Sequence, residues 1–214
     1  IRDLSLSPQM LGLAGGMFFF ALGVAQVPVG MGFDRIGPRY TLAWVSVFAL
    51  VGSMLMAMAA SGPQLIAGRF LVGLGSGASF ISGVVLLTRW YPPERIATQY
   101  GRIFAISQIG NFLAATPLAW MSEAFGWRAV FWGAAGVVLV VVVFFVWAVR
   151  DQPPEQAPLT RRGESLWQTL QGFAQVFGQR NYKKVVAIHT VAYAAMATVL
   201  GLWAGPYLHD VHGL

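Results

Sequence analysis

The chain has 214 residues, of which 57% are hydrophobic and only 10% are charged, and its mean hydropathy is +0.63. Soluble domains carry about 25% charged residues, so this composition excludes an ordinary water-soluble fold. The net charge is +6, but long uncharged runs separate the basic residues, so no nucleic-acid partner is expected. The chain has no cysteine, which excludes disulfides, a thiolate nucleophile and cysteine-ligated metals.

Six uncharged runs approach or exceed the roughly 20 apolar residues that a helix needs to cross a membrane. They cover residues 8–33, 40–61, 63–88, 103–122, 129–149 and 185–208, with Arg69 interrupting the third. A Gly-Pro turn precedes the third run, and Pro92 and Pro93 separate the third from the fourth. The sequence predicts an all-α, polytopic membrane protein with six transmembrane helices. No signal peptide is recognised before the first run, and we expect the chain to begin inside a longer protein.

Basic residues are distributed unequally between alternate loops, which predicts the orientation. One side has only Arg2 and Arg128. The other side has eleven: Arg35, Arg39, Arg89, Arg95, Arg102, Arg150, Arg161, Arg162, Arg180, Lys183 and Lys184. Because short cytoplasmic loops are enriched in Lys and Arg, both chain ends are expected outside. We expect a multi-pass protein of a bacterial inner membrane.

The segment 150–184 differs from the runs around it. Its prolines suggest an extended tether, and Ser165 and Gln168 then fit a helix capping box. Apolar residues recur at helical spacing over 166–177, with glutamines elsewhere around the helix. This pattern predicts a short amphipathic helix, either lying on the inner membrane surface or acting as a plain linker. We therefore divide the chain into residues 1–149, a cytoplasmic linker 150–184, and 185–214.

Five residues at and after the end of the first run, Gly30, Asp34, Arg35, Gly37 and Arg39, form the pattern G-x-x-x-D-R-x-G-x-R. This pattern resembles the loop signature between helices two and three of the major facilitator superfamily of secondary transporters. Arg69 before a glycine-rich stretch is similar to the family's fourth-helix motif. Residues 126–128, Gly-Trp-Arg, are similar to the outer turn that leads into its sixth helix.

The resemblance implies a twelve-helix fold of two related halves, in which the six runs are helices two to seven. Residues 1–149 would form most of the first half, and residues 185–214 would begin the second. Residues 1–6 and 208–214 are similar to each other, as a repeat of the halves requires. The implied function is transport of a small solute across the membrane by alternating access, without a cofactor. The resemblance also implies that Asp34 gates the transporter by contacting a helix end of the opposite half; the alternative is a simple helix cap.

Two transporter subclasses are not favoured by the sequence. The fifth-helix glycine pattern of drug antiporters is not intact, because residues 110–117 keep Pro117 but replace the surrounding glycines. Helix two of the implied numbering carries Gln26 and no arginine, and the fifth-helix signature of nitrate porters is absent. A nitrate substrate is therefore not supported, and a drug/proton antiporter is less favoured than a transporter of an organic or inorganic anion.

Arg69 is the principal candidate for binding substrate, because it is the only formal charge deep in a predicted span. An arginine at membrane depth costs about 2.5–3.5 kcal/mol and usually faces a cavity or a partner. It shares a helical stripe with Gly73 and Ser76, which are small enough to border water. The alternative is that Arg69 snorkels to the outer surface, about 9 Å away. The pairs Gly73/Gly77 and Gly12/Gly16 are typical of close helix packing.

The last run places His189, Tyr193 and Trp203 on one helical face, and we take them as further candidates for binding substrate. His189 could carry a coupling proton, although it could also be interfacial. Trp203 could instead belong to an aromatic belt at the membrane surface. No metal site is expected. The rival functions are a membrane enzyme, which would need acidic residues deep in a span, and a non-transporting sensor or scaffold.

Overall fold

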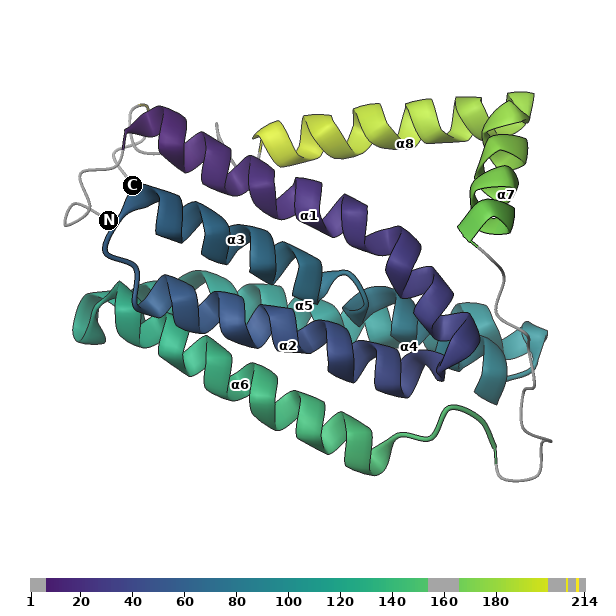
Figure 1. The fold of residues 1–214 in the computed structure, drawn as a ribbon, viewed down its shortest axis with the longest axis horizontal. Helices are drawn as coiled ribbons and strands as arrows, with labels where there is room; N and C mark the ends of the chain where they lie inside the picture. The colour runs from purple at the N-terminus through teal and green to yellow at the C-terminus, as the bar shows by residue number, and fades with distance from the viewer. Residues whose placement is uncertain (1–6, 154–165, 200–206, 208–210, 212–214) are drawn as a thin grey trace. The chain divides into compact units, whose positions relative to one another are not determined.

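A computed structural model describes residues 7–153, 166–199, 207 and 211 of the chain, which forms two compact units, residues 1–163 and 164–214. The predicted all-α class is confirmed, because the regular elements of the described residues are helices (Figure 1). The first unit holds α1 (Pro8–Arg35), α2 (Gly37–Ala57), α3 (Gly62–Ser76), α4 (Ser79–Trp90), α5 (Pro93–Phe125) and α6 (Trp127–Ala148). The second holds α7 (Leu166–Gly178) and α8 (Arg180–Thr198).

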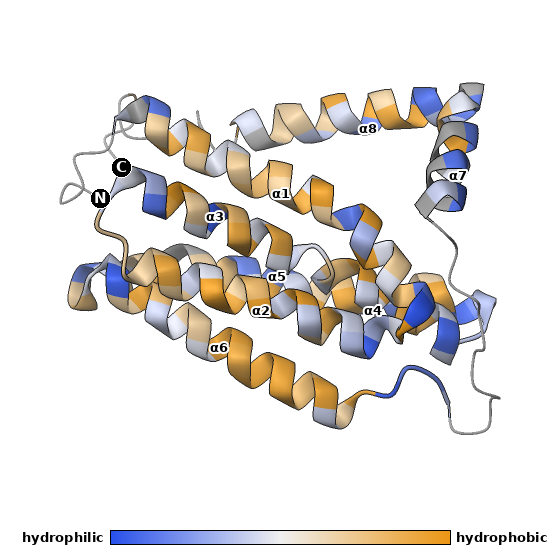
Figure 2. Cartoon of the chain, in the orientation of Figure 1, coloured by the Kyte–Doolittle hydropathy of each residue, from blue (hydrophilic) through white to orange (hydrophobic). Residues whose placement is uncertain are grey.

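Five stretches of the described residues are long and apolar enough to cross a membrane, which confirms a polytopic membrane protein. They are Gln9–Arg35, Gly37–Ala57, Gly62–Trp90, Pro93–Phe125 and Trp127–Ala148. Figure 2 shows that α6 is hydrophobic along most of its length and that a hydrophilic stretch follows a short distance beyond its end. The sixth predicted span, residues 185–208, is described only in part, as the later portion of α8.

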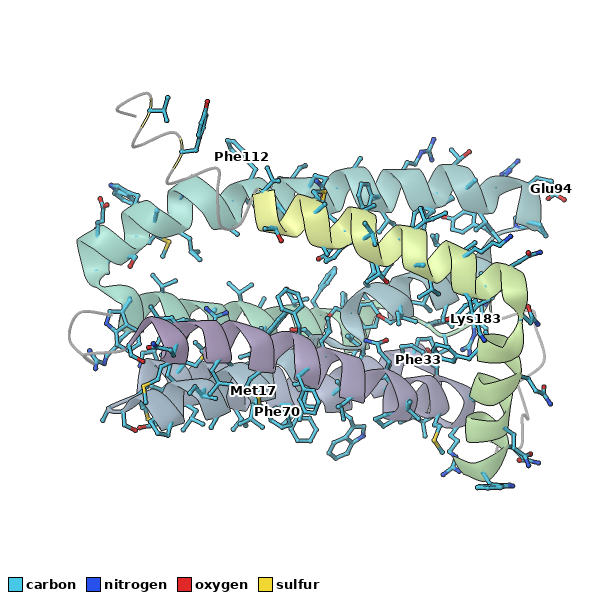
Figure 3. The ribbon with its side chains drawn as sticks, turned by 90° about the horizontal axis from the view of Figure 1, so that it is seen from above. Met17, Phe33, Phe70, Glu94, Phe112 and Lys183 are labelled. Carbon is cyan, nitrogen blue, oxygen red and sulfur yellow. The ribbon has the colours of Figure 1, made fainter. Side chains whose placement is uncertain are left out.

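The fifth helix begins at Pro93 rather than near residue 103, where the uncharged run starts. Proline is well suited to the first turn of a helix, since its missing N–H would have no intrahelical acceptor there. The helix then continues through charged residues that the apolar pattern leaves out. None of the described side chains in its apolar window is buried, and Phe112 is 70% exposed and stands out from α5 in Figure 3.

The third predicted span consists of two helices rather than one. α3 ends at Ser76 and α4 begins at Ser79, with Gly77 and Ala78 between them. Gln26 of α1 donates from Nε2 to the Gly77 carbonyl oxygen at 3.4 Å and to the Leu22 carbonyl oxygen at 3.1 Å. The break therefore has a hydrogen-bonding partner on the neighbouring helix.

Glycines allow α3 to pack closely between α1 and α2. A Cβ added to Gly73 would overlap the Phe18 carbonyl of α1, and one added to Gly75 would overlap Ala49 of α2. The predicted close packing of Gly73 is thus confirmed, and Gly77 meets Ala25 of α1 in the same way. The other predicted pair, Gly12 and Gly16, differs: added Cβ atoms there would have no described neighbour within 4 Å.

The loops of the first unit alternate between two ends of the helices, as predicted. At one end, the Trp90 Nε1 donates to the Arg150 carbonyl oxygen at 3.0 Å and Arg89 donates to the Phe33 carbonyl oxygen at 3.3 Å. At the other end, Arg128 donates from Nη2 to the Ala59 carbonyl oxygen at 3.1 Å. We call these the basic end and the Arg128 end.

The second unit contains the predicted linker helix. α7 runs across the direction of α8 in Figure 1, and the rings of Phe177 and Tyr182 meet edge to face at the corner, with centroids 5.4 Å apart. The helix expected after Ser165 is therefore present. Its location on the membrane surface stays a prediction.

Candidate functional site

Arg69 lies on the wall of a cavity of about 620 Å³ formed within the first unit. Five helices contribute to this cavity: α1, α2, α3, α5 and α6. Its wall is mainly apolar and aromatic, with Phe18, Phe131 and Trp127 among the lining residues. Arg69 is the only charged residue and Ser122 the only hydroxyl residue among the described residues that line it. A small anion could find a strong electrostatic partner here, together with apolar surface.

The guanidinium of Arg69 has no hydrogen-bond or ion-pair partner among the described residues. Other arginines of the same unit differ, because Arg39, Arg89 and Arg128 each donate to a backbone carbonyl oxygen. A permanently charged group at membrane depth normally pairs with an opposite charge or faces water. Arg69 is exposed in the first unit, so its guanidinium is accessible to water or to a bound anion.

Ser76 does not line the same cavity as Arg69. The Ser76 Oγ donates to the Val72 carbonyl oxygen at 2.8 Å, within its own helix. The residue borders a different pocket, whose other residues belong to α2, α3, α4 and the apolar face of α6. Spacing predicted that Arg69 and Ser76 share one face of the helix, but the two residues border different pockets. The structure therefore does not bring Ser76 together with Arg69 at one site.

The loop motif (Gly30, Asp34, Arg35, Gly37 and Arg39) lies at the basic end, where α1 ends and α2 begins. Gly37 has φ +83°, a conformation that favours glycine, and Arg39 lies in the first turn of α2. Gly30 is in open space, since an added Cβ would have no described neighbour within 4 Å. The motif therefore forms a sharp turn between two helices.

Asp34 does not serve as the helix cap that was the alternative to its gating role. It lies in the last turn of α1, is exposed, and makes no hydrogen bond or ion pair among the described residues. The first turn of α2 is instead capped by Asp151, whose Oδ1 accepts the Arg39 N–H at 2.7 Å. Sequence reasoning missed Asp151 because it follows α6, more than 100 residues from its partner.

The two candidates on α8 are adjacent, as helical spacing predicts. The rings of His189 and Tyr193 are stacked, with centroids 6.5 Å apart and planes inclined by 18°. Both side chains are exposed in the second unit. Trp203, the third candidate, lies outside the described residues. Within the described part of the chain, no group of three or more His, Asp or Glu could hold a metal ion.

Comparisons with known proteins agree on one family. The sequence profile described as the Major Facilitator Superfamily matches residues 1–214. The chain is 28% identical over 194 residues to a nitrate/nitrite transporter of Picosynechococcus, an alignment that covers 76% of the chain and 36% of that protein.

Two other similar proteins are named as transporters of solutes other than nitrate. A probable galactarate/D-glucarate transporter of Escherichia coli is 25% identical over 206 residues, covering 94% of the chain and 45% of that protein. A probable sulfoacetate transporter of Cupriavidus necator is 24% identical over 159 residues, covering 74% of the chain and 37% of that protein. The chain thus spans less than half the length of each of these relatives.

Proposed function

Since the chain belongs to the major facilitator superfamily, we propose that the intact protein is a secondary transporter that moves a small anion across a bacterial inner membrane by alternating access. The names of the similar proteins support an anionic solute, because nitrate, galactarate, glucarate and sulfoacetate all carry negative charge at neutral pH. Their bacterial origin supports the inner membrane. Membership of a transporter family and apolar helices argue against the rival of a membrane enzyme.

The observation that carries the proposal is the position of Arg69. Its charge lies on the wall of a largely apolar cavity and has no partner among the described residues. An apolar wall weakens screening, so a carboxylate, sulfonate or nitrate beside the guanidinium would interact more strongly than in water. The planar guanidinium also offers two parallel donors to such an anion, which gives geometric selectivity.

We further propose that transport is coupled to protons through residues of α8 in the second unit. Histidine is a common proton carrier in proteins, and the ring of Tyr193 stacks against that of His189. We take this pair as the proton-carrying and substrate-contacting part of α8. Replacing His189 with Gln should leave anion binding measurable but remove the stimulation of uptake by an inward proton gradient. Uptake that responds to the gradient as in wild type would contradict this assignment.

The test of the proposed function is stabilisation of the purified intact protein by candidate solutes. Nitrate, galactarate, glucarate and sulfoacetate are added one at a time, and the melting temperature is measured as a function of concentration. A ligand that binds only the folded state raises stability by about 2.7 kcal/mol at one hundred times its dissociation constant. At least one anion should raise the melting temperature progressively with its concentration, whereas choline chloride and mannitol should not.

Uptake into liposomes separates a transporter from a sensor or scaffold with the same fold. The proposal expects the stabilising anion to accumulate inside the vesicles. Binding without flux would favour the sensor. Stabilisation by hydrophobic cations, and by none of the anions, would favour a drug antiporter and contradict the proposal.

A further inference from the structure

A second cavity, of about 420 Å³, lies at the basic end of the first unit and is formed by α4, α5 and the end of α6. Most of its wall is apolar, with Leu86 and Leu87 of α4, Ile103 of α5 and Phe145 of α6 among the lining residues. The described residues that line it all differ from those that line the cavity of Arg69. We call this second cavity the basic-end groove.

The polar groups of the basic-end groove lie where its helices end. Trp90 and Tyr91 follow the apolar lining residues at the end of α4, and Arg150 follows the end of α6. The Trp90 Nε1 donates to the Arg150 carbonyl oxygen at 3.0 Å, which joins these two helix ends beside the groove. Tryptophan and tyrosine are enriched where the hydrocarbon of a membrane meets the headgroups. The groove thus changes from apolar to polar in the order in which a phospholipid changes from acyl chain to headgroup.

Arg150 provides the charge of the basic-end groove. It is the only charged residue among the described residues that line the groove, it is exposed, and its guanidinium makes no described hydrogen bond or ion pair. The carboxylate of the adjacent Asp151 accepts the Arg39 N–H through Oδ1 at 2.7 Å. Arg89 at the same end differs from Arg150, because it donates to the Phe33 carbonyl oxygen. An anion in the groove would therefore meet an available guanidinium.

The helices beside the groove present apolar surface to their surroundings. None of the described side chains in the apolar window of α5 is buried, and α6 is hydrophobic along most of its length, with Val143 and Phe144 exposed (Figure 2). A helix that is apolar all round is suited to contact with acyl chains. Gly83 of α4 leaves space within the groove, since an added Cβ would have no described neighbour within 4 Å.

We propose that the basic-end groove binds an anionic phospholipid of the cytoplasmic leaflet, with an acyl chain along its apolar wall and the phosphate beside Arg150. Basic pockets between transmembrane helices on the cytoplasmic side are suited to such headgroups. Other basic residues at this end attract anionic lipids by charge alone, whereas Arg150 combines charge with an apolar groove. The inference requires a membrane protein with its basic end at the inner surface, and it does not depend on which solute is transported.

The test measures how phospholipids stabilise the purified intact protein in detergent micelles. Dioleoyl phosphatidylglycerol replaces dioleoyl phosphatidylcholine stepwise at constant total lipid, and the melting temperature is recorded at each mole fraction. Arg150→Gln removes the charge in the groove but keeps the carbonyl oxygen that accepts from Trp90. Arg95→Gln is the matched control, because Arg95 is exposed at the same end, does not line the groove, and makes no described side-chain hydrogen bond.

Phosphatidylglycerol should raise the melting temperature of wild type above its value in phosphatidylcholine. In Arg150→Gln, half of this increase should need a mole fraction about fivefold higher, the change that one basic residue near an anionic lipid surface corresponds to. Arg95→Gln should titrate as wild type does. Glycerol phosphate, which has the headgroup charge but no acyl chain, should not reproduce the stabilisation that Arg150→Gln removes.

A second variant tests the apolar part of the groove. Gly83→Leu places a side chain in the open space beside Gly83, so it should weaken stabilisation by phosphatidylglycerol. Gly133→Leu is its control, because Gly133 of α6 also has no described neighbour for an added Cβ and does not line the groove. This control should keep the lipid response of wild type.

Equal losses in Arg150→Gln and Arg95→Gln would show that the basic surface attracts anionic lipid without a site, and would overturn the proposal. Equal stabilisation of wild type by the two phospholipids would overturn it as well. If Gly83→Leu does not fold, Arg150→Gln decides, because its side chain has no described contact to lose. The proposed function is judged separately, by stabilisation with soluble anions and by variants of Arg69, so either proposal can fail while the other stands.

Discussion

Gln26 on α1 and Gly77 at the break between α3 and α4 are joined by a hydrogen bond from the Gln26 Nε2 to the Gly77 carbonyl oxygen, at 3.4 Å. The same nitrogen donates to the Leu22 carbonyl oxygen at 3.1 Å. Ending α3 at this point frees backbone groups that lipid cannot satisfy. A polar side chain within an apolar helix therefore has a structural role, and binding of substrate need not be invoked for it.

Replacing Gln26 with Leu should destabilise the protein by about 1–3 kcal/mol, the usual cost of leaving a buried polar group without its partner. Thermal unfolding of the purified intact protein measures the change. Gln9→Leu is the control, because Gln9 is an exposed residue of the same helix with no described side-chain hydrogen bond. Equal melting temperatures for the two variants would show that the Gln26 bond contributes nothing measurable.

Gly73 and Gly12 both belong to G-x-x-x-G pairs, but replacing each with alanine should affect the melting temperature differently. At Gly73 the new methyl group would meet the Phe18 carbonyl and lie 2.9 Å from the Ala21 Cβ, whereas at Gly12 it would meet nothing within 4 Å. Overpacking typically costs about 1–3 kcal/mol. Gly73→Ala should lower the melting temperature, while Gly12→Ala should leave it unchanged or raise it. The reverse order would contradict the packing of α3 against α1.

The orientation can be tested with single cysteines in the cysteine-free chain. Ser61→Cys and Glu123→Cys should react with an impermeant maleimide added to intact cells, because both positions belong to the side with few basic residues. Arg95→Cys should react only after the membrane is opened. Labelling of Ser61→Cys only from the cytoplasmic side would invert the topology.

Hydropathy and turn residues predicted the helices well, because lipid requires long apolar segments whatever their tertiary contacts. The run 63–88 was predicted as one helix, since both α3 and α4 are apolar and the break is visible only through the partner on α1. Arg69 could be identified from its charge alone. The rest of its cavity could not, because five helices distant in sequence form the wall. The same reason hid Asp151, whose effect depends on contact with Arg39.

Asp34→Asn should lower transport by roughly fivefold or more, a typical size for conformational coupling, with little loss of folded protein. The reason is that Asp34 is exposed and makes no described bond, so its removal costs the first unit no contact. Uptake and the labelling rate of a cavity cysteine are measured together, with Glu123→Gln as a charge-matched control at the Arg128 end. Unchanged uptake and unchanged labelling would count against a gate at Asp34.

The proposed role of Arg69 also predicts the effect of replacing it with lysine. Lysine keeps the positive charge but not the planar pair of donors, so Arg69→Lys should weaken anion binding while the protein without substrate stays as stable as wild type. The readouts are the dissociation constant and the melting temperature. If Arg69 were instead part of a structural ion pair, Arg69→Ala would lose stability even without substrate.

Transport by Arg69→Gln at limiting substrate tests the central claim most directly. Glutamine has similar size and keeps a hydrogen-bond donor, but it removes the only charge among the described residues that line the cavity. A hydrogen bond to a charged group contributes about 1.5–3 kcal/mol, so uptake of the anion should fall by about tenfold or more. Uptake equal to that of wild type, with equal amounts of folded protein in the vesicles, would contradict the assignment of Arg69 as the anion-binding residue.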